Sequence, residues 1–100
     1  MGIASEEVIQ NFLALIKQGE RTLLFNEVDI IHEQGIDLHN FAKQTLMHID
    51  QNLDEDTDFL LGASEIFTHI ISTIRYYPYP AIVYKIAINK FLTPGVQSTQ

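Results

Sequence analysis

The fold is decided by residues 74–91, which read IRYYPYPAIVYKIAINKF. This stretch contains all four tyrosines of the chain and two of its three prolines. Proline has no backbone N–H and disfavours helical geometry at the residue before it, so Pro78 and Pro80 end one helix, and Pro80 suits the first turn of the next. The stretch therefore predicts a helix, a sharp corner and a second, strongly apolar helix from about Pro80 to Leu92.

Four further helices are predicted upstream, from apolar residues spaced by threes and fours and from capping residues. Ser5 caps the first helix and Gly19 ends it, and Asp37 caps the third. We expect the acidic run at 54–58 to break the third helix, residues 59–62 to cross back over the core, and Ser64 to cap the fourth helix. The predicted fold is all-α, a five-helix bundle, with helices at about 6–18, 20–34, 38–53, 65–77 and 80–92.

The length and composition fit one domain with a modest hydrophobic core. We expect a single helical domain over residues 1–100, with its core at about 5–92 and a flexible tail at 93–100. No apolar run approaches the roughly 20 residues that span a bilayer, and no secretory signal precedes the acidic start of the first helix. We therefore expect a cytoplasmic protein without a membrane partner.

The charge balance excludes one class of partner and the composition excludes several kinds of chemistry. Thirteen acidic and six basic residues give a formal net charge of −7, which repels phosphate backbones, so we expect no direct binding to nucleic acid. The chain has no cysteine and therefore no disulfides, thiolate nucleophile or thiolate metal site. Protein partners are the expectation that remains.

Catalytic motifs are missing as well. There is no glycine-rich phosphate loop and no nucleophile elbow, and no two of the four histidines lie four residues apart, as ligands on one helix face would. We expect no enzymatic activity and no cofactor for this chain. A catalytic or ligand-binding bundle would have to use His69 and Tyr84, the two polar residues nearest the predicted apolar faces.

An acidic segment leaves a calcium-binding alternative open. Counted from Asp54 as position 1, Asp56, Asp58 and Glu65 fall at positions 3, 5 and 12 of an EF-hand loop. Phe59 occupies position 6, where the sharp turn around the ion requires glycine. The alternatives are a calcium-responsive helical module over residues 54–65 and a solvated acidic turn.

The order of three motifs resembles a known family. The motifs are IKQGE at 16–20, IHEQGIDLHNF at 31–41 and RYYPYPAIVYKIAI at 75–88. Together they resemble the collar domain, the third domain, of the gamma/tau subunit of the bacterial DNA polymerase III clamp loader, over residues 8–92. The family usually has an arginine and a glutamate where this chain has Ala81 and Lys85.

The resemblance implies a role in assembly. It implies the collar-type helical fold and a fragment of a longer protein whose preceding modules form an ATPase. The chain itself would hold the clamp-loader subunits together in DNA replication, by binding other subunits and by self-association. Another helical protein-interaction domain is the alternative.

The interface is predicted from the apolar excess of the last helix. A helix that is apolar around more than half of its circumference is either central in its own domain or shared with a neighbour. We predict a subunit interface formed by the aromatic corner and this helix, with the residues Tyr76, Tyr77, Tyr79, Tyr84, Ile88 and Phe91.

Overall fold

Short-range capping sets the ends of the first helices in the computed structural model, which describes residues 3–92. α1 (Glu6–Gln18) begins at Ser5, whose Oγ accepts a hydrogen bond from the Val8 N–H, and it ends at Gly19. Gly19 has a φ of 70°, a left-handed conformation that glycine adopts without steric cost. α2 (Arg21–Glu33) follows at once, so the two helices form a tight antiparallel pair.

The remaining elements are also helical. α3 (Leu38–Gln51) is capped by Asp37, whose carboxylate accepts from the His39 and Asn40 N–H groups. A short 3₁₀ turn, η1 (Leu53–Glu55), leads into α4 (Thr57–Ile74), and α5 (Pro80–Phe91) starts with its proline in the first turn. Residues 3–92 contain these five helices and no strand, which confirms the predicted all-α bundle. The predicted tail at 93–100 lies outside the described residues.

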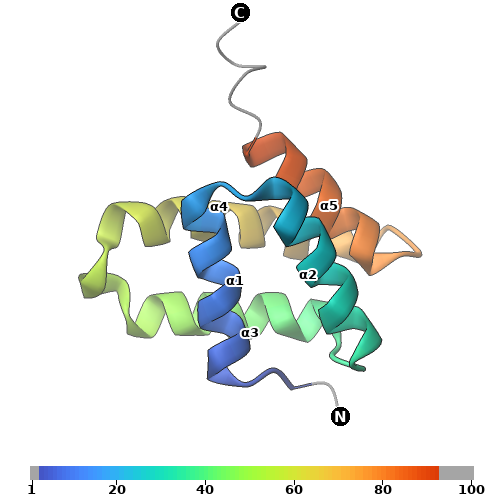
Figure 1. The fold of residues 1–100 in the computed structure, drawn as a ribbon, viewed down its shortest axis with the longest axis horizontal. Coiled ribbons are helices and arrows are strands. Elements are labelled where there is room, and N and C mark those ends of the chain that lie inside the picture. Colours follow the sequence, from blue (N-terminus) through green and yellow to red (C-terminus); the bar gives the residue numbers. More distant parts are fainter. Residues whose placement is uncertain (1–2, 93–100) are drawn as a thin grey trace, which may run out of the picture.

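Four of the five helices pack in two pairs, and α1 crosses one of these pairs (Figure 1). α3 and α4 run side by side in opposite directions, joined by η1 at one end of the molecule. α2 packs along α5, and α1 crosses over α3 and α4 in contact with both. The corner between α4 and α5 lies at the far end of α4 from η1, so the two ends of α4 carry different surfaces.

Four aromatic rings from four helices form the centre of the core. Phe12, Phe41, Phe67 and Tyr84 are fully buried, and the centroids of the contacting ring pairs, all of which include Phe12 or Tyr84, lie 5.3–6.4 Å apart. Edge and tilted contacts of this kind add to the hydrophobic gain from burying each ring. The cluster ties α1, α3, α4 and α5 to one another.

The start of α4 corrects the prediction for the fourth helix. Ser64 does not cap a helix there, because α4 already begins at Thr57 and the Ser64 hydroxyl donates to the Leu61 carbonyl. Leu60 and Ala63 are buried with the spacing that continues to Ile66, so the apolar stripe of this helix extends one and a half turns further upstream than predicted. Residues 59–62 are therefore helix and not a crossing segment.

The end of α4 is also earlier than predicted. The helix stops at Ile74, and the Tyr76 and Tyr77 N–H groups turn back to the Thr73 and Ile74 carbonyls. Because proline restricts the residue before it, Tyr77 leaves helical geometry ahead of Pro78. Both tyrosines thus belong to the corner and not to the helix.

Candidate functional site

The corner between α4 and α5 places three tyrosines on the surface. Tyr76 and Tyr79 are 76% and 72% exposed, and Tyr77 is 45% exposed. Tyr79 has an extended backbone and caps α5 without a side-chain hydrogen bond. We call Tyr76, Tyr77 and Tyr79 the aromatic corner.

The outer side of α5 continues this apolar surface. Ile82 and Ile86 are 44% and 48% exposed, and they follow Tyr79 at intervals of three and four residues, the spacing of one helix face. Tyr77 and Ile86 line a cavity of about 140 Å³ between α4 and α5, together with His69, Thr73 and Val83. Tyr77 and Ile86 therefore connect the aromatic corner with the outer side of α5.

Two of the predicted interface residues belong to the interior, and this corrects the prediction for them. Tyr84 and Ile88 are completely buried in the core of the chain. The Tyr84 hydroxyl donates to the Leu38 carbonyl, and burial, with a smaller contribution from the Asp37 charge, raises the pKa of Tyr84 well above its ordinary value. Neither residue is available to a partner, because that side of α5 faces the interior of the bundle.

Phe91 and Lys85 are partly buried. Phe91 is half-buried, with its ring 6.0 Å from the His69 ring. Lys85, which stands where the clamp-loader family usually has a glutamate, forms an ion pair of 2.9 Å with Asp29 of α2. Lys85 thus connects α5 to α2 within the chain.

The two polar candidates for a catalytic bundle have separate surroundings. Tyr84 lies within the ring cluster of Phe12, Phe41 and Phe67, whereas His69 faces Phe91 near the surface. Within residues 3–92 no hydrogen bond joins the two side chains, and the Tyr84 hydroxyl donates to the Leu38 carbonyl instead.

The acidic segment does not form the loop that a calcium site requires. Asp54 lies in η1, and residues 57–65 belong to α4, so Asp58 and Glu65 stand seven residues apart on one helix. At 1.5 Å per residue they are separated by roughly 10 Å along the helix axis. Within residues 3–92, no three His, Cys, Asp or Glu side chains are grouped to hold a metal ion. The EF-hand alternative is wrong, because residues 57–65 form the start of α4 and not a calcium-binding loop.

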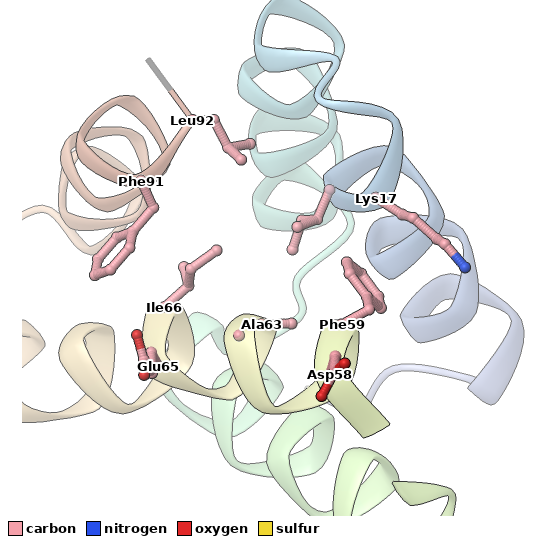
Figure 2. Close-up of a pocket in the computed structure, with 10 residues that line it drawn as sticks. Lys17, Asp58, Phe59, Ala63, Glu65, Ile66, Phe91 and Leu92 are labelled. Atoms are coloured by element: carbon pink, nitrogen blue, oxygen red, sulfur yellow. The ribbon is translucent and has the colours of Figure 1, made fainter. Parts of the chain in front are cut away.

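A second surface feature is a groove formed by three helix segments that are distant in sequence. It has a volume of about 350 Å³ and lies between the end of α1, the first half of α4 and the end of α5. Figure 2 shows Phe59, Ile66, Phe91 and Leu92 around the hollow, with Asp58 and Glu65 along one edge of α4. The rest of its lining is Ile16, Lys17, Gly62 and Ala63. We call this the α1/α4/α5 groove.

Of the charged side chains that line this groove, Lys17 is paired within residues 3–92, whereas Asp58 and Glu65 are not. Lys17 forms an ion pair with Asp56 and lies 5.5 Å from the centre of the Phe59 ring. The Asp58 and Glu65 carboxylates have no hydrogen bond or ion pair with any other residue of 3–92. The groove thus combines an apolar lining with two uncompensated negative charges.

The comparisons with known proteins identify no relative. No family model, no curated protein and no solved structure matches the chain. No helix within residues 3–92 has the length and apolar character needed to cross a membrane.

Proposed function

We propose that the chain is a collar-type oligomerisation domain of a bacterial DNA polymerase III clamp loader, which holds the loader's subunits together in DNA replication. The observation that carries the proposal is the exposure of five large side chains on the corner and α5, namely Tyr76, Tyr77, Tyr79, Ile82 and Ile86. Aromatic side chains are enriched where proteins contact each other, because they bury a large area with few rotatable bonds.

The concentration of these residues favours an interface over ordinary surface exposure. Single exposed apolar residues are normal on any protein. Here five large apolar side chains within eleven consecutive positions, 76–86, lie outside the core. Burial of this surface releases roughly 25 cal/mol per Å² of apolar area, of which part offsets the entropy lost on association.

The sequence resemblance at 31–41 and 75–88 is the reason for proposing a clamp loader in particular as the assembly. In this proposal the partners are other clamp-loader subunits and further copies of the chain, the location is the cytoplasm, and the ATPase activity belongs to other modules of the parent protein. The acidic net charge of −7 agrees with protein partners and not with direct contacts to DNA.

Sedimentation velocity tests the proposal. The chain is run over a range of concentrations, alone and mixed with the other subunits of a bacterial clamp loader. We expect a larger species in at least one of the two conditions. The double variant Tyr76→Ser/Tyr79→Ser should weaken that association at least tenfold, because truncating central aromatic contacts typically costs more than about 1 kcal/mol.

Met47→Ser provides the matched control. Met47 is also exposed, at 61%, but lies on α3 away from the aromatic corner. Its substitution should leave the association unchanged. A chain that stays monomeric alone and ignores the other subunits refutes the proposal, and self-association without any binding to those subunits would instead indicate another helical interaction domain.

A further inference from the structure

The α1/α4/α5 groove presents an apolar surface that no described residue of the chain covers. Its lining comes from Phe59 and Ile66 of α4 and from Phe91 and Leu92 at the end of α5 (Figure 2). The volume of about 350 Å³ is at the lower end of the range for binding cavities, so it suits one or two side chains and not a whole helix.

Gly62 gives a second reason to expect an occupant. It lies inside α4, where glycine is less favourable than alanine by roughly 1 kcal/mol. Its backbone is helical, and a Cβ placed on it would meet no atom within 4 Å, so nothing within residues 3–92 requires glycine there. A glycine that lines an open groove allows another chain to approach the helix backbone closely.

The charges identify what kind of side chain fits. Asp58 and Glu65 at the groove edge are unpaired, whereas Lys17 is engaged by Asp56. An aromatic or aliphatic side chain with a neighbouring arginine would place its apolar part in the groove and its charge against these carboxylates. The chain itself carries such a pair, because Arg75 and Tyr76 are adjacent, exposed and outside the core.

We propose that the aromatic corner of one copy docks into the α1/α4/α5 groove of a second copy, with Tyr76 in the groove and Arg75 facing Asp58 and Glu65. This inference rests on the proposed function and names the contact that produces assembly.

The corner cannot reach the groove of its own chain. Gly62 and Arg75 are thirteen positions apart, which is roughly 20 Å along an α-helix that ends at Ile74. Docking therefore joins different surfaces of two copies. A contact between unlike surfaces generates a ring or an open chain and not a closed two-fold dimer.

Disulfide trapping tests the geometry directly, since the natural chain has no cysteine. The variants Tyr76→Cys and Gly62→Cys are prepared separately, mixed and mildly oxidised. We expect a covalent heterodimer well above the yield of either variant alone. The control mixture pairs Tyr76→Cys with Met47→Cys, which is exposed on α3 outside the groove, and should give only background.

Charge reversal tests the recognition. Arg75→Glu should weaken self-association in sedimentation at least tenfold, and mixing it with Asp58→Arg/Glu65→Arg should restore most of it. These exposed substitutions lie outside the core, and circular dichroism checks that each variant stays folded.

The outcomes separate the two proposals. If the chain binds copies or other subunits but the Tyr76→Cys and Gly62→Cys pair gives no more heterodimer than the control, the docking is wrong and the proposed function stands. The same holds if the chain binds other subunits and never itself. A chain that associates with neither overturns both.

Discussion

Replacement of Gly62 by alanine should stabilise the folded chain. Gly62 has a helical backbone within α4, and a Cβ there meets nothing within 4 Å. The substitution removes conformational freedom from the unfolded chain and adds no clash, so we expect the free energy of unfolding to rise by about 0.5–1 kcal/mol. For a domain of this size each kcal/mol corresponds to roughly 4–8 °C, so the melting temperature should rise by about 2–8 °C.

Gly19→Ala is the control, because the space around Gly19 is equally open. Its φ of +70° is the difference between the two sites. A left-handed conformation costs a residue with a Cβ about 1–2 kcal/mol, so this variant should lose roughly 1 kcal/mol. Urea denaturation and thermal circular dichroism at low protein concentration measure both. A Gly62→Ala variant that is unchanged or less stable would refute the reasoning from open space and helical backbone.

Three further predictions concern the core and the α2–α5 contact. Phe67→Ala removes a fully buried ring from the aromatic cluster and should lower the free energy of unfolding in urea by about 3–5 kcal/mol, and a loss below about 1 kcal/mol would contradict its central place. Tyr84→Phe removes the hydroxyl that donates to the Leu38 carbonyl and should cost about 0.5–1.5 kcal/mol near neutral pH. The pKa of Tyr84 in the folded chain lies above its unfolded value of 10.0, so Tyr84 contributes fully to the free energy of unfolding below pH 10.0, and this contribution is lost as the pH rises toward the folded pKa. Tyr84→Phe should therefore reduce the loss of stability at alkaline pH, whereas Tyr76→Phe should leave that loss unchanged. Lys85→Ala breaks the partly exposed ion pair with Asp29 and should lower the free energy of unfolding by less than about 1 kcal/mol, and by less still in high salt. A larger or salt-independent loss would show that packing of the aliphatic part of Lys85 dominates.

Local signals in the sequence predicted the helices well. Ser5, Gly19 and Asp37 act within one turn of the chain, so their capping and stop roles can be recognised without knowledge of the tertiary structure. The proline corner is equally local. The acidic run at 54–58 misled the prediction, because charged residues at the first turn of a helix resemble those of a solvated loop.

The orientation of α5 was not predictable from spacing. Tyr84 and Ile86 both belong to an apolar sequence, yet one is in the core and the other is exposed. A helix that is apolar on most sides gives no periodic signal for which side faces inward, and only its packing against the other helices, above all α2 and α4, decides it. The sequence prediction extended the fourth helix to Tyr77, whereas the helix ends at Ile74 and leaves Tyr76 and Tyr77 in the corner before Pro78.

The α1/α4/α5 groove had no sequence signal as a unit. Its lining comes from residues 16–17 of α1, from one side of α4 between positions 58 and 66, and from residues 91–92, which only the folded chain brings together. One clue existed in Gly62, a glycine within a segment whose apolar residues follow helical spacing. Recognising it required the correct start of α4.

The distribution of the four tyrosines gives the chain an optical probe. There is no tryptophan, so tyrosine emission is the intrinsic fluorescence of the protein. Three emitters lie in the solvent-exposed corner and the fourth, Tyr84, lies in the interior, hydrogen-bonded to a carbonyl. A soluble quencher therefore reaches the three and not the fourth, and the quenchable fraction of the emission reports how far the corner is covered, without any label.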